Sequence, residues 1–217
     1  MSVTDPVSTA PLETRTLIRR VANRLCSEFA GTFGEETIQR YIVESYASLS
    51  DAKVTGFIPL FTERFTRQRL NALARVEGKV TTDRPMVVFL CVHNAGRSQM
   101  AAGWMQHLAG EGVEVFSGGS DPASVINHSA ITAMAEIGID IAGEFPKPWT
   151  DEIVGAADVI VTMGCGDACP VFPGKRYLDW DVADPAGLPL EQVRPIRDDI
   201  GARVHSIAEE LGIAPRL

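Results

Sequence analysis

The sequence predicts an α/β protein: a four-stranded parallel sheet with helices on both faces, preceded by a small all-α three-helix bundle. Two observations predict it. After about residue 84, short apolar runs rich in β-forming residues alternate with helical patterns, which is typical of a buried parallel sheet. Before that point, three amphipathic segments follow one another with short links. The 217 residues suffice for two domains, so we expect an N-terminal domain over 1–83 and an α/β domain over 84–217.

The N-terminal domain is predicted to hold three helices, because apolar residues recur one turn apart over 14–31, 34–49 and 59–75. In the first helix this stripe consists of Leu17, Val21, Leu25 and Phe29. Cys26 lies near the stripe, and we interpret it as a small buried hydrophobe. Residues 1–13 are rich in Ser, Thr and Pro and are expected to form a mobile tail. The polar segment 77–85 contains Gly and Pro and is interpreted as a linker.

The α/β domain is predicted from the order of its elements. Buried strands are expected over 86–90, 113–117, 158–163 and 175–180. Helices are expected over 98–109, 127–137, 148–154 and 190–211. A ligand should bind beyond the carboxyl ends of the strands, where such sheets carry their sites.

Charge and composition exclude some classes of function. The formal net charge of −8 argues against nucleic acid or an anionic membrane as the main partner. The sequence begins without an apolar signal region, and no segment is long enough to span a bilayer, so we expect a cytoplasmic protein. In that compartment its four cysteines are expected to be catalytic, redox-active or free rather than structural disulfides.

The most informative stretch is the loop between the strand at 86–90 and the helix after it. Cys91 and Arg97 enclose this loop with the spacing C-x5-R, and Ser98 follows directly. Successive N–H groups at a helix N-terminus can bind an oxyanion, and Arg97 could clamp two of its oxygens. These positive surroundings favour the thiolate of Cys91, to which Ser98 could donate a hydrogen bond. The oxyanion is expected to contact Val92, His93, Asn94, Ala95, Gly96, Arg97 and Ser98.

The alternative is that Cys91 is a buried residue at the end of a strand and Arg97 a surface cation. For the spacing alone this alternative would be favoured, because such pairs occur by chance. A predicted strand before the loop and a predicted helix after it instead favour the anion site.

The stretch VVFLCVHNAGRSQMAAGW resembles the active-site loop of low-molecular-weight tyrosine phosphatases and of the arsenate reductases built on that fold. Gly96 stands where the phosphatases usually have a second cysteine, and the run Arg97-Ser98-Gln99-Met100-Ala101 is closer to the reductases. The resemblance extends from about Arg84 to the C-terminus. It implies that Asn94 and Ser117 hold the loop in shape. Some members bind potassium through acidic side chains, but Ala102 stands at such a position, so no metal is expected.

Two further cysteines, Cys165 and Cys169, follow the third predicted strand. Parallel strands end at one edge of the sheet, so these thiols could approach Cys91, or could pair with each other. A zinc site is disfavoured because no second cysteine pair or suitably spaced histidine is present. The alternative is an incidental pair of loop thiols. Resemblance to the thioredoxin-coupled arsenate reductases implies a disulfide relay through Cys91, Cys165 and Cys169.

An acidic residue is expected to complete the site. The resemblance implies an Asp before a Pro that protonates the leaving oxygen, which matches Asp184 before Pro185. Asp179 and Asp181 are nearby competitors, and only Pro185 distinguishes them. Asp184 could also simply initiate a turn before the proline. The two roles are compatible.

Together these features predict a cytoplasmic enzyme that reduces arsenate to arsenite for arsenic detoxification. No bound cofactor is expected, and the reductant would be an external dithiol protein, thioredoxin. The rivals are a phosphatase acting on phosphotyrosine, arsenate reduction coupled to a small thiol such as mycothiol or glutathione, and a binding protein whose loop senses an anion. For the N-terminal helices, a homodimer contact and docking of the reductant are both open.

Overall fold

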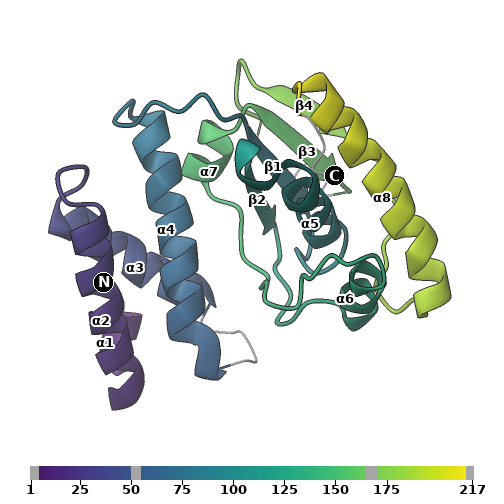
Figure 1. Ribbon diagram of the computed structural model, residues 1–217. Coiled ribbons are helices and arrows are strands. Elements are labelled where there is room, and N and C mark those ends of the chain that lie inside the picture. Colours follow the sequence, from purple (N-terminus) through teal and green to yellow (C-terminus); the bar gives the residue numbers. More distant parts are fainter. Residues whose placement is uncertain (1–4, 50–54, 165–170, 214–217) are drawn as a thin grey trace. The chain divides into compact units, whose positions relative to one another are not determined.

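The structure is a computed structural model that describes residues 5–49, 55–164 and 171–213. The chain divides into two compact units, residues 1–81 and 82–217, which are coloured purple to blue and blue to yellow in Figure 1. Each unit has its own hydrophobic core. The domain boundary that we expect at 83/84 lies close to this division.

The first unit is helical. It contains α1 (Pro6–Thr9), α2 (Leu12–Glu28), α3 (Glu35–Leu49), the 3-10 turn η1 (Thr55–Phe57) and α4 (Ile58–Val76). The short helix α1 corrects the expectation of a mobile tail over 1–13. Asp5 caps this helix by accepting a hydrogen bond from the Val7 backbone N–H at 2.9 Å, and Pro6 occupies its first position.

The inner face of α2 differs from the prediction by one residue. Ile18, Val21 and Leu25 are buried, whereas the side chain of Leu17 is 37% exposed. Both sets have helical spacing, so periodicity alone could not distinguish Leu17 from Ile18. Cys26 packs at the margin of this core, and burial, aided by Glu35, raises the pKa of its thiol. This environment agrees with an unreactive structural residue.

Charged residues join α2 to α4. Glu63 on α4 accepts hydrogen bonds from Arg24 Nε and from Arg67 Nη2, both at 3.0 Å. Arg67 also donates from Nε to Glu28 at 2.8 Å. The hydrogen bond from Arg24 is the largest of the effects that lower the pKa of Glu63. The ionised form of Glu63 therefore stabilises the contact between the two helices.

We predict that Glu63→Gln weakens this unit at neutral pH by about 1–2 kcal/mol, because the arginines lose their charged acceptor. A carboxyl group whose pKa is lowered by folding stabilises the fold at pH values above its ordinary, unfolded-state pKa. That contribution is lost as the pH falls through the lowered pKa of the folded state. The difference between variant and wild type should therefore shrink at acid pH. Hydrogen exchange of the α2 and α4 amides, compared between variant and wild type at neutral and at acid pH, measures this difference in stability. A similar loss in Glu36→Gln, at an exposed carboxylate of α3, would contradict the assignment.

The second unit is built on a four-stranded parallel sheet. Its strands are β1 (Met86–Cys91), β2 (Glu114–Gly119), β3 (Val159–Met163) and β4 (Arg176–Asp179), in the order β2-β1-β3-β4. All six residues of β1 are buried, as expected for an inner strand. The predicted α/β fold class is confirmed.

Helices cover both faces of this sheet. They are α5 (Arg97–Ala109), α6 (His128–Ala135), α7 (Asp151–Ala156) and α8 (Leu190–Glu210), with the 3-10 turn η2 (Gly110–Gly112) after α5. Figure 1 shows α5 and α8 on one side of the sheet and α7 on the other. Val87, Phe89 and Cys91 of β1 share a core with α5, α6 and α8. Cys91 therefore lies at the end of an inner strand, beneath the helix that follows it.

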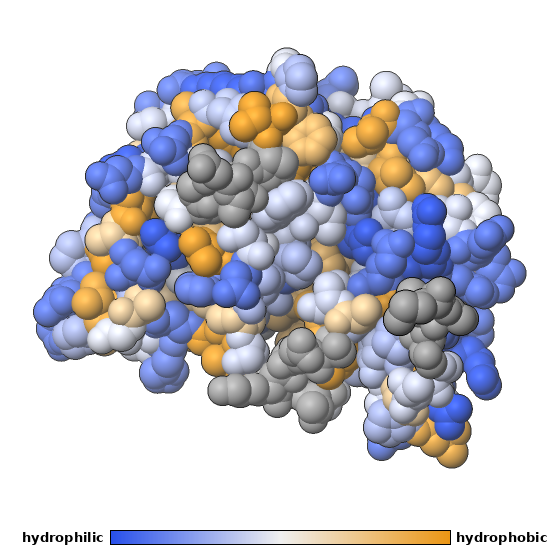
Figure 2. Space-filling model, turned by 180° about the vertical axis from the view of Figure 1, so that it is seen from behind, coloured by the Kyte–Doolittle hydropathy of each residue, from blue (hydrophilic) through white to orange (hydrophobic). Residues whose placement is uncertain are grey.

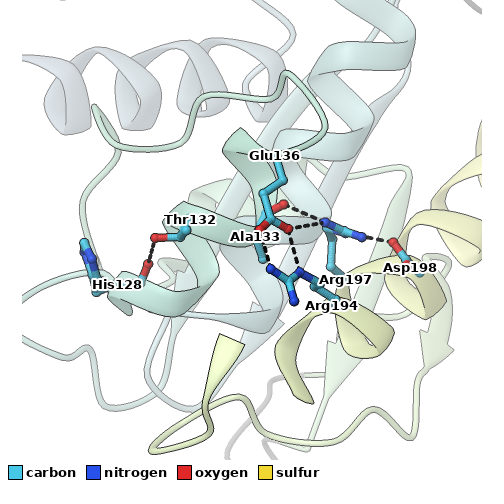
Figure 3. A network of polar contacts seen from close by, with 7 residues as sticks. All are labelled: His128, Thr132, Ala133, Glu136, Arg194, Arg197 and Asp198. Atoms are coloured by element: carbon cyan, nitrogen blue, oxygen red, sulfur yellow. Dashed lines mark hydrogen bonds and ion pairs between the residues drawn. The ribbon is translucent and has the colours of Figure 1, made fainter. Parts of the chain in front are cut away.

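A polar network fixes α6 against α8 (Figure 3). Arg194 donates two hydrogen bonds to the carboxylate of Glu136, at 2.8 and 2.7 Å. Arg197 donates from Nη1 to the Ala133 carbonyl at 2.8 Å and from Nε to Asp198 at 2.7 Å. Cations at the carboxyl end of α6 also complement its dipole. The opposite end of α6 borders the cleft described below, so this network helps to position the wall of that cleft.

On the face in Figure 2, hydrophobic residues are interspersed with hydrophilic ones. Among the described residues, large hydrophobic side chains are exposed at Leu12, Leu17, Phe57, Leu60, Val76, Val80, Val125 and Val171. Within the same part of the chain, no helix combines the length and the apolar character needed to cross a membrane.

We predict that residues 84–217 fold without the N-terminal helices, because the sheet and its covering helices all lie within that segment. The isolated fragment should give an α/β circular dichroism spectrum and a cooperative thermal transition. A disordered spectrum would show that the two units depend on each other.

Candidate active site

The candidate site begins where β1 ends. Cys91 is the last residue of this strand and is 2% exposed, and α5 begins six residues later at Arg97. The N–H groups in the first turn of a helix lack intrahelical partners. The loop and the start of α5 therefore offer backbone donors beside a buried thiol, which is the arrangement that the sequence predicts for an oxyanion site.

Asn94 gives the loop its shape. Its φ angle is +46°, the only positive φ of a non-glycine residue in the described parts of the chain. Asparagine tolerates this conformation better than most residues. The turn directs the Asn94 backbone N–H to Cys91 Sγ at 3.2 Å. The loop thus aims a backbone donor directly at the sulfur.

The Asn94 side chain extends this arrangement. Its Nδ2 donates to Ser98 Oγ at 2.8 Å, and Ser98 Oγ lies 3.0 Å from Cys91 Sγ. Because Ser98 already accepts a hydrogen bond from Asn94, its own hydroxyl hydrogen is available to the sulfur. Two donors thus converge on Cys91, as the sequence predicts for Ser98.

Residues from a distant segment brace the same asparagine. Lys147 donates its backbone N–H to Asn94 Oδ1 at 3.0 Å, and Gln99 Nε2 lies 3.2 Å from that oxygen. Gln99 Nε2 also lies 3.0 Å from the Asn94 carbonyl and 3.1 Å from the Phe145 carbonyl. Residues 145–147 therefore fix the side chain that orients the cysteine loop. Sequence analysis did not identify Gln99, Phe145 or Lys147 as part of the site.

Arg97 and Asp184 face each other across the site. The Arg97 side chain is nearly buried and donates from Nη2 to Asp184 Oδ2 at 2.7 Å. Its Nη1 lies 3.4 Å from the Val182 carbonyl. The other Asp184 oxygen accepts the Ala186 N–H at 2.9 Å, so Asp184 also initiates a turn. Both roles expected for Asp184 are geometrically compatible.

The structure separates the three candidate aspartates. Asp184 pairs with Arg97, whereas Asp179 accepts a hydrogen bond from the Thr162 hydroxyl at 2.6 Å. Asp181 contributes its backbone carbonyl to Arg203 at 3.2 Å. Asp184 lines the cleft that contains Cys91, and the other two do not. The geometry therefore favours the aspartate before Pro185.

The cleft has a volume of about 550 Å³ and is open to solvent. Cys91, His93, Ala95, Gly96 and Arg97 form one side, and Asp184 to Leu188 form the other. The wall between them is the start of α6, where Asn127 Nδ2 donates to the Pro185 carbonyl at 3.2 Å. Of the predicted loop residues, Val92, Asn94 and Ser98 do not line this cleft. The Val92 carbonyl oxygen faces Gly119, and a Cβ added to Gly119 would lie 2.5 Å from that oxygen.

The contacts described above do not directly test two of the predictions, the cysteine relay and the role of Ser117. Cys165 and Cys169 fall outside the described residues, so the relay stays a prediction. Ser117 is buried and accepts a long hydrogen bond from Lys147 Nζ at 3.4 Å, which links it indirectly to Asn94. Among the described residues, no three His, Cys, Asp or Glu side chains cluster in a way that could hold a metal ion.

Comparisons with known proteins match both units of the chain. Residues 86–214 match the low molecular weight phosphotyrosine protein phosphatase family. Residues 18–74 match a domain described as protein-tyrosine-phosphatase-like, N-terminal. The resemblance that the cysteine loop predicts is confirmed, and the N-terminal helices correspond to a domain of their own.

Several proteins similar to this chain are described as arsenate reductases. An arsenate reductase of Staphylococcus haemolyticus is 37% identical over 128 residues, which cover 57% of this chain and 96% of that protein. An arsenate reductase of Halalkalibacterium halodurans is 38% identical over 58% of this chain and 97% of its own length. A solved thioredoxin-dependent arsenate reductase of Corynebacterium glutamicum is 43% identical, covers 91% of this chain and 97% of its own, and has a TM-score of 0.82.

We predict that Gly96→Ala damages the anion site. An added Cβ would lie 2.5 Å from Pro185 Cγ, so either the loop or the Asp184 segment must move. The variant should bind phosphate, a tetrahedral test ligand, at least about tenfold more weakly, a loss of about 1.4 kcal/mol. Calorimetric titration measures the affinity. Gly112→Ala is the matched control, because nothing lies within 4 Å of its added Cβ. Wild-type affinity in Gly96→Ala would contradict the close contact.

Proposed function

The chain belongs to the low molecular weight phosphotyrosine protein phosphatase family, and we propose that it is an arsenate reductase that uses thioredoxin as its reductant. The convergence of Asn94 N–H and Ser98 Oγ on Cys91 Sγ, opposite the Arg97–Asp184 pair, carries this proposal. Such a site supplies a nucleophile, an oxyanion clamp and a proton donor for one substrate oxygen.

In the first step, Cys91 thiolate attacks the arsenic atom of arsenate. A sulfur–arsenic bond forms, and one oxygen leaves as water after receiving a proton from Asp184. The loop N–H groups and Arg97 hold the remaining oxygens. Arg97 pairs with Asp184 before substrate binds, so the incoming oxyanion must share or replace that contact.

In the second step, Cys165 attacks Cys91 Sγ. A disulfide forms between them, the sulfur–arsenic bond breaks, and its electron pair stays on arsenic, which is thereby reduced from As(V) to As(III) and leaves as arsenite. Cys169 then attacks Cys165, which releases the Cys91 thiolate and leaves a Cys165–Cys169 disulfide. Thioredoxin, a dithiol protein, reduces this disulfide and restores the enzyme.

Several observations support reduction over phosphate-ester hydrolysis. The phosphatases of this fold usually have a second cysteine where Gly96 stands, and hydrolysis would leave Cys165 and Cys169 without a task. Similarity to a thioredoxin-dependent arsenate reductase extends over 91% of the chain. Tyrosine phosphatase activity is the second candidate, because the Cys91 loop and Asp184 could serve both reactions. Coupling to a small thiol such as mycothiol is the alternative for the reductant.

The wider setting follows from this reaction. Arsenic detoxification in the cytoplasm is the role we propose, because thioredoxin and free thiols act in that compartment. Arsenate and thioredoxin are the proposed partners, without a bound cofactor. A homodimer through the N-terminal helices is a further proposal, which light scattering of the full chain tests.

We predict that Cys169→Ser releases about one equivalent of arsenite per enzyme and then stops when thioredoxin is the only reductant. Each exchange step needs its own thiolate, so the enzyme should accumulate a Cys91–Cys165 disulfide. Arsenite release and peptide mapping without reduction measure both outcomes. Cys26→Ser is the matched control and should turn over normally, because Cys26 packs at the margin of the N-terminal helical core, outside the proposed relay, and burial raises the pKa of its thiol.

Multiple turnovers by Cys169→Ser at the wild-type rate would contradict the relay and favour the small-thiol mechanism. Hydrolysis of p-nitrophenyl phosphate without any arsenate reduction would favour the phosphatase instead.

A further inference from the structure

The N-cap residue of α6 connects two walls of the cleft. Asn127 is partly buried, and its side-chain oxygen Oδ1 accepts the Ala130 N–H at 3.0 Å, which caps the helix. Because that oxygen serves as the cap, the amide nitrogen Nδ2 is the group that donates to the Pro185 carbonyl at 3.2 Å. The Asn127 backbone N–H donates to the Ala95 carbonyl at 2.9 Å. One asparagine therefore contacts both the cysteine loop and the segment that carries Asp184.

The acid segment, residues 184–188, is held from α6 at two points. Asn127 contacts the Pro185 carbonyl, which also accepts the Leu188 N–H at 3.2 Å. The Ser129 hydroxyl donates to the Leu188 carbonyl at 3.3 Å. Both of these α6 residues line the cleft. The first turn of α6 thus supports a segment that has no helix or strand of its own.

Two further contacts join the acid segment to the cysteine loop, and a bound oxyanion disturbs one of them. Pro185 lies so close to Gly96 that a Cβ added to the glycine would meet the proline Cγ at 2.5 Å. Asp184 accepts a hydrogen bond from Arg97 at 2.7 Å. An oxyanion in the loop competes with this carboxylate for the guanidinium, because both bind the same donors. The contacts of Asn127 involve neither charged group, so they do not depend on that competition.

We propose that Asn127 is a positioning residue for Asp184, which keeps the acid segment beside the cysteine loop while the oxyanion occupies Arg97. The inference rests on the proposed function, because it takes Asp184 as the proton donor to the leaving oxygen. Proton transfer requires the donor to lie within hydrogen-bond reach of that oxygen, and a small displacement slows it. Loss of the Asn127 contact should therefore slow the reaction without weakening anion binding, which depends on the loop and Arg97.

The test replaces Asn127 by residues that cap a helix but lack the amide donor. Serine and aspartate are both favoured at the N-cap, and each keeps the backbone N–H that contacts Ala95. In the full chain, Asn127→Ser should lower the single-turnover rate at saturating arsenate about three- to tenfold, as the loss of one hydrogen bond would. The half-saturating arsenate concentration and the phosphate affinity should stay within about twofold of wild type. If the serine variant does not fold, Asn127→Asp, which keeps the size of the side chain, decides the question.

A double-mutant cycle tests whether Asn127 acts through Asp184. In an Asp184→Asn background the proton donor is already missing, so adding Asn127→Ser should change the residual rate by less than about twofold. Thr132→Ala is the matched control in α6, because the Thr132 hydroxyl donates to the His128 carbonyl at 3.0 Å, away from the acid segment (Figure 3). This control should keep the wild-type rate. An equal loss from Asn127→Ser in both backgrounds would show a general effect on the fold and overturn the proposal.

Amide hydrogen exchange follows the acid segment without any turnover. With phosphate bound, the Ala186 and Leu188 amides, which are hydrogen-bonded within the segment, should exchange about three- to tenfold faster in Asn127→Ser than in wild type. The Ala130 amide, which serine still caps, should be unchanged. Unchanged exchange at Ala186 and Leu188, or a wild-type single-turnover rate, would overturn the role of Asn127 alone. A wild-type protein that makes no arsenite would contradict the proposed function, and exchange would then decide whether Asn127 holds the segment.

Discussion

The chemistry of this protein depends on the left-handed backbone conformation of Asn94. This conformation directs the Asn94 N–H at Cys91 Sγ, and it places the side chain where it donates to Ser98. Ser98 in turn lies 3.0 Å from the same sulfur. A residue that could not adopt a positive φ would displace both donors together. The bracing by Gln99 and Lys147 is consistent with the need to hold this one conformation.

The parallel topology of the sheet brings a second segment to the site, the one that follows β4. The strands end at one edge of the sheet, so the segment after β4 returns beside the loop after β1. Pro185 then packs on Gly96, and Asp184 reaches Arg97. Asn127 at the start of α6 fixes the same segment through the Pro185 carbonyl, and the Arg194–Glu136 and Arg197–Ala133 contacts hold α6 on α8. The network between α6 and α8 thereby supports the helix that contacts the segment after Asp184.

Local patterns predicted the parts of the structure that local physics decides. The β1 strand, the cysteine loop and α5 could be predicted because apolar runs, a C-x5-R spacing and a helical stripe follow one another. The choice of Asp184 over Asp179 rested on Pro185, and the contact with Arg97 agrees with it. The apolar pattern predicts Leu17 on the buried face that Ile18 occupies instead, because a one-residue shift preserves helical spacing. The helix α1 has only four residues and no apolar stripe, so periodicity does not predict it, and only the Asp5 cap and Pro6 indicate it.

Lys147 could not be predicted in the same way. It lies between Pro146 and Pro148, in a segment with no periodic pattern, and a lysine in a loop is normally exposed. Its importance arises only when the chain returns 53 residues later to the side of Asn94. Contacts of this kind depend on tertiary structure, so a single sequence carries no local signal for them.

The most direct test of the account is a single turnover of the fully reduced wild-type protein with one equivalent of arsenate and no added reductant. The account predicts one arsenite per enzyme, with Cys91 again free to be alkylated and Cys165 joined to Cys169 in a disulfide. Arsenite release that leaves all three thiols free, or no arsenite at all, would contradict a relay that starts at Cys91.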